Sequence, residues 1–403
     1  MRIAYITAQA PYGKGETFIN EEMLAIKEKA DLLVFPRNPE KVIFHEDAKI
    51  LVDNSIWLPL IDLKMLFNLL LFLLINPQTW KVLKDVFRNS RNPNILFKNL
   101  IVLPKGVYIS KVISKLNIDH IHSHWGSTTS TIAYIVSQLT GIPWSFTLHR
   151  WDISENNMLK EKARTAKFIK IISKVGYDEV LEIIGNEYKN KCFILHMGVD
   201  ITKFTKKGEK IDKRDKDSFI IDTPANLIEE KGHKYLIDAI EILRQKSYNI
   251  KCYFFGDGPL REELEKTVNN MSLRDVIIFE GAIPHDRLLK LYANNEVDCV
   301  VLPSIVTDKG EHEGIPVSLM EAMAYCIPVI STNTGGIPEL LSNNAGITVQ
   351  EKNPEQLAIA IEKLIMNKSL REKIGEQGYK KACKEYNVQK NIIKLIGLFE
   401  LYS

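Results

Sequence analysis

The strongest constraint on the fold is a pattern that recurs through the second half of the chain. A short apolar run is followed by a loop rich in glycine or proline, and then by a segment with helical spacing. The apolar runs predict strands at 218–223, 252–255, 276–279, 297–302 and 327–331. Strands that alternate with helices favour a parallel sheet with helices on both faces. This half is therefore predicted to be a doubly wound α/β domain.

The first half repeats the pattern and is predicted to be a second domain of the same class. Strands are expected at 3–6, 32–35, 144–147, 168–173 and 192–196. A charged stretch without apolar periodicity, Lys206–Asp217, is typical of a linker. We expect domains at 1–200 and 218–387 joined by a linker at 201–217, with helices at 355–367, 369–385 and 388–401.

Composition places the chain among soluble globular proteins. Its 403 residues are 45% hydrophobic and 26% charged, with a net charge of +3, which is enough for two cores. The five cysteines are scattered and form no metal-binding pair, which favours a reducing cytoplasm and no zinc site. The run Arg2–Ile6 is too short for a signal peptide, and Met65–Ile75 is too short to span a bilayer.

Residues 55–117 differ from the rest of the chain. They contain nine lysines and arginines but only two acids, with aromatic residues between the bases. These could be core-packing helices with a solvated basic face, or a surface that rests on anionic lipid. Nucleic acid is a third partner for such a composition, but no motif for it is present, so we expect none. The first two interpretations stay open.

A pair of glutamates marks the candidate ligand site. Glu313 and Glu321 are eight positions apart, between two predicted strands. A helix starting near Pro316 would place Glu321 on its second turn and Glu313 in the preceding loop. The helix N-terminus then offers N–H groups beside a carboxylate, which suits a ligand with an anion and hydroxyls, such as a sugar nucleotide. A buried helix with one solvated glutamate is the alternative.

The first half carries candidate residues at the ends of its strands. Gly13 and Gly15 follow the first strand and could cradle a phosphate or sugar, or could simply form a tight turn. His124 ends a run of alternating histidines, 120, 122 and 124, and His149 follows the next strand. A metal is conceivable at the alternating histidines, but no carboxylate or cysteine stands at ligand spacing. We therefore expect His124 and His149 to face a crevice.

Short motifs are spread over both halves of the chain. They are Glu16–Ile19, Thr147–Asp152, His196–Asp200, Glu230–His233, Phe255–Leu260, Pro303–Ser304, Glu313–Ala324, Pro328–Thr332 and Gly335–Glu339. With these motifs the chain resembles retaining glycosyltransferase family 4, and in particular the branch that builds bacterial exopolysaccharide, capsule or lipopolysaccharide. The resemblance covers nearly the whole chain and is weakest over 40–117. It implies the GT-B fold, α/β with two Rossmann-like doubly wound parallel-sheet domains facing a central cleft, and a C-terminal helix, 388–403, that packs back on the first domain.

The resemblance also implies roles for individual residues. Glu321 would bind the ribose hydroxyls, Glu313 the donor sugar, and His149 the sugar being transferred. The catalytic set is thus Glu313, Lys231 and His149, and the remaining donor-site residues are Glu321, Asn226, Gly314, Ile315, Pro316, Val317, Ile283 and Pro284. Lys231, Asn226 and the amides near Val317 would meet the diphosphate, and Ile283 and Pro284 the base. Gly13, Gly15 and Glu16, with His124, would form the first-domain loop near the acceptor.

The implied activity is transfer, with retention, from a UDP- or GDP-sugar to a saccharide or a polyprenyl-diphosphate-linked saccharide, without metal or other cofactor. We expect a cytoplasmic protein, peripheral on the inner face of the plasma membrane if 55–117 rests on lipid. One position departs from the family, because Asn226 stands where an arginine is usual. A non-catalytic GT-B protein that binds a nucleotide sugar is the alternative, and a sugar-nucleotide epimerase of the same architecture is a further one.

Overall fold

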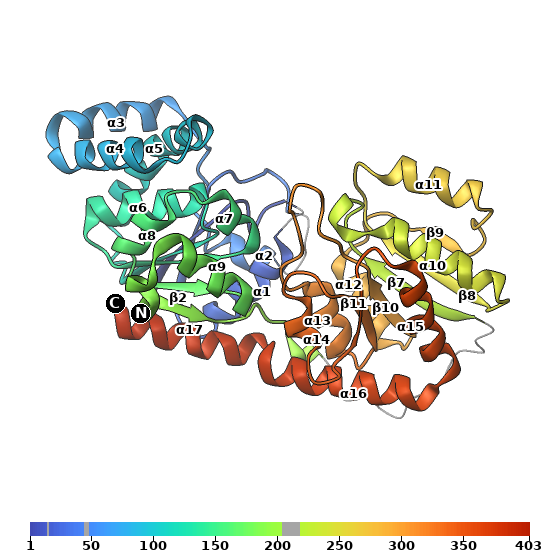
Figure 1. Ribbon diagram of the computed structural model, residues 1–403. Coiled ribbons are helices and arrows are strands. Elements are labelled where there is room, and N and C mark those ends of the chain that lie inside the picture. The colour runs from blue at the N-terminus through green and yellow to red at the C-terminus, as the bar shows by residue number, and fades with distance from the viewer. Residues whose placement is uncertain (14–15, 44–47, 204–217) are drawn as a thin grey trace. The chain divides into compact units, whose positions relative to one another are not determined.

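The computed structural model describes residues 1–13, 16–43, 48–203 and 218–403, which divide into two compact units (Figure 1). Unit 1 consists of Met1–Met197 and Val388–Ser403, and unit 2 of Gly198–Asn387. Most of the expected linker, 204–217, lies outside the described residues. Its first three residues, Ile201–Lys203, form a short 3-10 helix in unit 2.

Unit 1 is built on a six-stranded sheet in which all neighbouring strands are parallel. The strands are β1 (Arg2–Thr7), β2 (Asp31–Pro36), β3 (His120–His124), β4 (Trp144–Leu148), β5 (Phe168–Ile171) and β6 (Cys192–Ile194). Their order is β2-β1-β3-β4-β5-β6. The chain winds outward from β1 toward one edge through β2 and then toward the other edge from β3. The topological switch point therefore lies between β1 and β3.

Helices cover both faces of this sheet. They are α1 (Thr17–Lys27), α2 (Lys49–Val52), α3 (Leu63–Ile75), α4 (Pro77–Asn89), α5 (Pro93–Ile113), α6 (Thr128–Thr140), α7 (Arg150–Glu155), α8 (Leu159–Thr165), α9 (Lys174–Ile184) and α17 (Val388–Tyr402). The C-terminal helix α17 packs beside α1, and its Phe399 lies against the rings of His120 and Phe168. Helices α3, α4 and α5 form an outer layer next to α6 (Figure 1).

Unit 2 repeats this architecture with a second parallel six-stranded sheet. Its strands are β7 (Phe219–Pro224), β8 (Ile250–Phe255), β9 (Ile277–Phe279), β10 (Cys299–Leu302), β11 (Val329–Thr332) and β12 (Ile347–Val349), in the order β12-β11-β10-β7-β8-β9. The helices are α10 (His233–Gln245), α11 (Arg261–Asn270), α12 (His285–Ala293), α13 (Val317–Ala324), α14 (Ile337–Leu341), α15 (Pro354–Met366) and α16 (Lys368–Glu385). Here the switch point lies between β7 and β10.

Local sequence explains where these elements begin and what they bury. Strands β1 and β10 contain apolar residues that are buried on both faces, Ile3–Ile6 and Val300–Leu302, as parallel sheets covered by helices require. The central strand β3 is an exception, because it buries three histidines whose rings are hydrogen-bonded. Helices α3, α4 and α5 each begin at an Asp or Asn whose side chain accepts a first-turn N–H. No single helix among the described residues is long and apolar enough to cross a membrane. Only the pair α3 and α4, bent by 110°, meets that criterion.

Candidate functional site

The candidate residues of unit 2 gather at its switch point. The loop after β7 leads to Lys231, and the loop after β10 leads to Glu313 and then to α13. Because β7 and β10 are neighbours and parallel, their following loops emerge side by side at one edge of the sheet. Open α/β sheets bind ligands at the carboxyl ends of the strands at such a point. Topology alone therefore makes this edge the first candidate for a ligand site.

Lys231 and Glu313 form an ion pair at this edge. The Nζ atom of Lys231 donates to Oε2 of Glu313, and the side chains remain 19% and 14% exposed. Two glycines permit the close approach of their loops. A Cβ on Gly232 would lie 2.0 Å from the carbonyl oxygen of Pro303, and a Cβ on Gly335 would lie 1.8 Å from that of Glu313. Both glycines have positive φ, so the pair is positioned by backbone that other residues do not readily adopt.

Glu321 has a partner that the sequence did not reveal. The side chains of His285, the first residue of α12, and Glu321, in α13, meet with 2.7 Å between Nε2 and Oε1. The loop just before α12 contains Ile283, which is half-buried, and Pro284, which is exposed and caps the helix. The structure therefore brings the residues expected at the nucleobase next to the carboxylate expected at the ribose.

The start of α13 matches its expected position. Pro316 is the N-cap residue and Val317 the first residue of the helix, so the first-turn N–H groups have no intrahelical partner. In the preceding loop the carbonyl of Gly314 accepts the N–H of Gly336 at 3.0 Å, and Ile315 is buried. These contacts hold the loop that carries Glu313 against the turn before α14.

Asn226 is exposed at the beginning of the loop that leads to Lys231. Its carbonyl accepts the N–H of Ile228 at 2.9 Å, so its backbone belongs to a tight turn. A neutral amide at this position adds a hydrogen-bonding group to the edge but no positive charge. The positive charge at this edge comes from Lys231 and from the N-terminal end of α13.

In unit 1, His124 and His149 meet at the carboxyl edge of the sheet. Their Nε2 atoms are 2.8 Å apart, and the Trp125 ring packs 4.4 Å from that of His149. His149 is half-buried, and its backbone N–H donates to the Asp152 carboxylate at 3.0 Å. His124 is completely buried. It can therefore orient His149, whereas contact with a ligand falls to His149.

A buried chain of polar side chains stands behind the two histidines. The Tyr5 hydroxyl donates to Glu22 at 2.6 Å and lies 2.7 Å from Nδ1 of His124, and Lys170 pairs with the other oxygen of Glu22. Burial by itself raises the pKa of Glu22, but Lys170 and, to a smaller extent, the nearby His124 ring outweigh it and hold that pKa well below its usual range. Glu22 is therefore ionised deep inside unit 1.

The ionisation states of these buried side chains determine which of their atoms carry a proton. Because ionised Glu22 can only accept, it accepts the hydrogen bond of the Tyr5 O–H, and the Tyr5 oxygen can then accept from Nδ1–H of His124. Burial lowers the pKa of both His124 and His149, so each ring is neutral. Nε2 of His124 is then an acceptor, and His149 must donate its Nε2–H to it. These hydrogen bonds thus select one tautomer of His124 and one of His149.

The first-domain loop is braced by Glu16. Oε2 of Glu16 accepts the N–H groups of Gln9 and Ala10 at 2.7 and 2.6 Å, and Oε1 accepts from the indole of Trp125. Gly13 has a φ of +79° and its N–H donates to Val42 at 3.1 Å. Gly15, also predicted here, lies outside the described residues. The side-chain carboxylate of Glu16 therefore shapes the loop by accepting these backbone and indole N–H groups.

Two of the alternating histidines, His120 and His122, contact hydroxyl groups of the neighbouring strand β4. His120 contacts the hydroxyl of Ser145 through Nε2, and His122 contacts those of Ser145 and Thr147, at 2.8 to 2.9 Å. Both are completely buried. Within the described residues no group of three His, Cys, Asp or Glu side chains could hold a metal ion.

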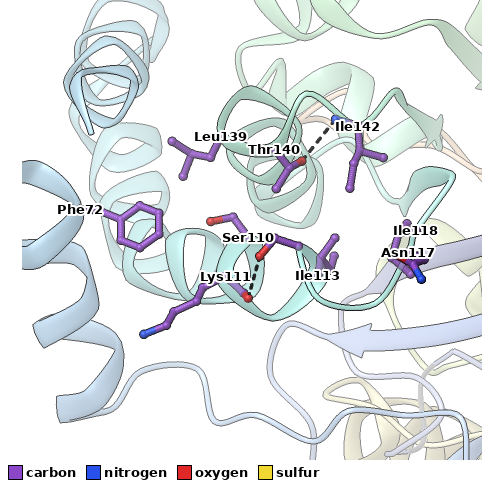
Figure 2. Close-up of a pocket in the computed structure, with 10 residues that line it drawn as sticks. Phe72, Ser110, Lys111, Ile113, Asn117, Ile118, Leu139, Thr140 and Ile142 are labelled. Carbon is purple, nitrogen blue, oxygen red and sulfur yellow. Dashed lines mark hydrogen bonds between the residues drawn. The ribbon is translucent and has the colours of Figure 1, made fainter. Parts of the chain in front are cut away.

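A cavity of about 470 Å³ lies at the opposite edge of the unit 1 sheet (Figure 2). Asn117 and Ile118 precede β3, and Ile142 precedes β4, so the cavity is at the amino ends of these strands. Its remaining walls come from α3, α5 and α6, with Phe72, Ser110, Lys111, Ile113, Ser114, Leu139 and Thr140. Ligand sites of such sheets form at the other edge, so this cavity is separate from the histidine site.

Comparison with known proteins agrees with the architecture. Residues 204–381 match the family model described as glycosyl transferases group 1. The matched residues lie within unit 2. The whole chain is similar in structure to the Anabaena protein Alr3699/HepE in complex with UDP, with a TM-score of 0.73, 15% identity and complete coverage of both chains. It is also similar to a glycosyltransferase from Rickettsia africae, with a TM-score of 0.71, 20% identity and coverage of 100% and 98%. The chain has the GT-B fold.

Relatives in sequence carry names from polysaccharide synthesis. The putative colanic acid biosynthesis glycosyltransferase WcaL of Salmonella typhimurium is 35% identical over 42% of this chain and 40% of its own length. The amylovoran biosynthesis glycosyltransferase AmsK of Erwinia amylovora is 30% identical over 54% and 53%. The chain thus matches about half or less of the length of these relatives.

Proposed function

We propose that this protein is a retaining glycosyltransferase that moves a sugar from a UDP- or GDP-sugar to a saccharide acceptor in bacterial surface polysaccharide synthesis. The observation that carries the proposal is the edge of the unit 2 sheet. There a lysine, a helix N-terminus and two carboxylates lie together at the switch point, within a group 1 domain. The names of the relatives support the polysaccharide context.

The first task of this edge is to stabilise the leaving nucleoside diphosphate. An ammonium group has three N–H donors, and Lys231 uses one of them toward Glu313, so a phosphate can take the others. The first-turn N–H groups of α13 add hydrogen bonds and the positive end of the helix dipole. Negative charge develops on the diphosphate as the glycosidic bond breaks, so these donors act most strongly in the transition state.

The second task is to hold the rest of the donor. Glu321 accepts one hydrogen bond from His285, and a carboxylate has sites for further donors, so the ribose hydroxyls can bind there as well. We assign Ile283 and Pro284 to the nucleobase and Glu313 to the hydroxyls of the donor sugar. His149, fixed in one tautomer in unit 1, is assigned to the sugar being transferred.

We further propose that transfer needs no metal and retains the anomeric configuration. Lys231 and α13 supply the positive charge that a metal would otherwise bring. The bond from the anomeric carbon to the diphosphate breaks, the acceptor oxygen bonds to that carbon from the same face, and its proton passes to the departing phosphate. The acceptor that we propose is a saccharide, free or linked to polyprenyl diphosphate. In the second case the protein would work at the inner face of the plasma membrane, in contact with it through 55–117.

A thermal-shift screen against UDP-, GDP- and CMP-sugars tests the donor class. A shift with one nucleotide identifies it, and transfer is then measured with that donor. Glu321→Gln should lower kcat/KM more than tenfold, whereas Glu262→Gln, on the exposed face of α11, should not. Binding without hydrolysis or transfer would favour the alternative, a non-catalytic nucleotide-sugar-binding protein. Equal activity of both variants would remove the assignment of Glu321.

A further inference from the structure

Helix α3 is apolar on both of its faces. The inner face rests on unit 1: Met65 and Asn68 are buried, and Leu69 and Phe72 pack against the core. Lys111 of α5 donates to the side chain of Asn68 at 2.8 Å, and Phe72 forms one wall of the cavity in Figure 2. These contacts fix the rotation of the helix. Its outer face is therefore a defined surface.

The outer face of α3 exposes large apolar side chains in a continuous stripe. Leu63, Phe67, Leu70 and Leu74 are 85%, 66%, 62% and 84% exposed and follow one another at helical spacing. Leu66 and Ile75 lie beside them and are also exposed. A helix that is apolar all round is normally buried on all sides, and an exposed apolar patch of this kind marks an interaction surface.

The next helix, α4, exposes aromatic and basic residues. Trp80 and Phe87 of α4 are 57% and 53% exposed, and the bases of the same face are also exposed. These bases are Lys81, Lys84 and Arg88, followed by Arg91 just after the helix. The one acid between 63 and 98, Asp85, accepts a hydrogen bond from Tyr134. The exposed bases of α4 therefore form a positively charged rim.

We propose that α3 and α4 form an anchor that lies in the plane of an anionic bilayer, with the stripe of α3 in the acyl region and the bases of α4 among the headgroups. Leu, Phe and Trp on one side with Lys and Arg beside them is the composition of such interfacial helices. Helix α3 has 13 residues, about 20 Å of helix, and α4 turns away by 110°, so the pair lies on the membrane and does not cross it.

The positive charge of this surface favours an anionic bilayer over a second copy of the protein as its partner. Two copies that met through the stripe would bring their basic rims together, whereas anionic lipid headgroups complement them. The proposal deepens the proposed function, since it would bring the enzyme to a lipid-linked acceptor. Its evidence comes from α3 and α4 alone and does not depend on the donor site.

Vesicle flotation tests the anchor in the full-length protein. Binding to vesicles with half phosphatidylglycerol should exceed binding to pure phosphatidylcholine at least tenfold and should fall with salt. The double variant Phe67→Ser with Leu70→Ser should lose binding at least tenfold. Its control, Ile359→Ser with Met366→Ser, changes two exposed apolar residues of α15 and should bind like the wild type. Lys81→Glu with Lys84→Glu should abolish the preference for anionic vesicles.

Trp80 reports the depth of insertion. Its fluorescence, obtained by subtracting the spectrum of Trp80→Phe, should be quenched more by lipids brominated near the headgroup than by lipids brominated near the chain ends. The opposite order would overturn the in-plane arrangement. A wild type that stays off vesicles, or a dimer in light scattering that Phe67→Ser with Leu70→Ser dissolves, would overturn the proposal in favour of a protein partner. Nucleotide thermal shifts on the same variants test the donor site separately and should be unchanged.

Discussion

The carboxyl edges of the two sheets hold their polar groups in different ways. In unit 1, the side chains just behind that edge, Tyr5, Glu22, His124 and Lys170, are all buried and bond one another. In unit 2, the pairs at the edge keep 11% to 19% of each side chain exposed. A buried ion pair cannot exchange partners without leaving a charge in an apolar interior, whereas a partly solvated pair can. Unit 1 is thus built to hold one arrangement, and unit 2 to accept a ligand.

The largest effect should follow from breaking the buried pair. Glu22→Gln leaves Lys170 without its carboxylate in the core, and we expect the free energy of unfolding of unit 1 to fall by about 3–5 kcal/mol. Hydrogen exchange measured by mass spectrometry should show the loss of protection in β1, α1 and β5, and none in the strands of unit 2.

The matched change in unit 2 sharpens the contrast. Glu313→Gln breaks the pair with Lys231 at a partly exposed position and should cost less than about 1 kcal/mol. Adding Lys170→Met to Glu22→Gln should restore much of the lost stability, because no unpaired charge remains. Equal losses in Glu22→Gln and Glu313→Gln would contradict the distinction between the two edges.

Lys231→Ala should produce the converse result, a loss of activity with little loss of stability. Removing one of the groups that stabilise the leaving diphosphate should lower kcat/KM between tenfold and a hundredfold, about 1.4 to 2.7 kcal/mol. Single-turnover transfer measures the chemical step directly. Lys234→Ala is the control, because Lys234 is exposed on the neighbouring helix α10. Comparable losses in the two variants would show that general charge, not the placement of Lys231, matters.

Low pH should reduce the free energy of unfolding of both units, because each contains a buried histidine with a lowered pKa. Burial, with a smaller contribution from Lys167, lowers the pKa of His120 to about 3. Between pH 6.5 and 3 the unfolded chain therefore binds a proton that the folded chain excludes. Stability that is present above pH 6.5 is lost as the pH falls. From pH 7.5 to 5.5 this amounts to about 1.4 kcal/mol.

The variant His120→Phe isolates this contribution. Phenylalanine fits between Phe168 and Phe399, and the loss of the contact with Ser145 is the same at each pH. Urea midpoints of wild type and variant should therefore converge or cross as the pH falls. In unit 2 burial lowers the pKa of His233 to about 3 as well, and His233→Phe should show the same pH dependence. Curves that stay parallel would mean that His120 has the same pKa in the folded and unfolded states.

The sequence predicted most elements of the fold because the strands are apolar and the loops carry glycine and proline. Strand β8 was expected at 252–255 and extends over Ile250–Phe255. Strand β12 was missed, because Thr348 interrupts its short apolar run, whereas the equally short edge strands β6 and β9 lie in unbroken apolar runs. Strand β6 ends at Ile194, two residues earlier than expected, where the chain leaves the neighbouring strand.

The candidate site was predictable only in part, because some of its contacts join residues that are far apart in the sequence. The spacing of Glu313 and Glu321 is local and placed both relative to α13. The pair Lys170–Glu22 joins residues 148 positions apart, and His285–Glu321 joins residues 36 apart. No local pattern encodes such contacts. A lysine within the otherwise apolar strand 168–173 was the one available signal, since a buried ammonium requires a buried carboxylate.

The smallest expected effect concerns the neutral residue in the unit 2 edge. Asn226 is exposed, so an arginine fits there without disturbing the core. A guanidinium can bind a phosphate through two parallel hydrogen bonds, and Asn226→Arg should tighten nucleotide binding threefold to tenfold in calorimetry. Asn226→Lys should gain less, because it adds charge without the paired geometry, and Asn270→Arg, at the far end of α11, should gain nothing. If Asn226→Arg raises affinity without raising kcat, Lys231 and α13 already suffice for the leaving group. A gain in kcat would show instead that this edge lacks charge in the transition state.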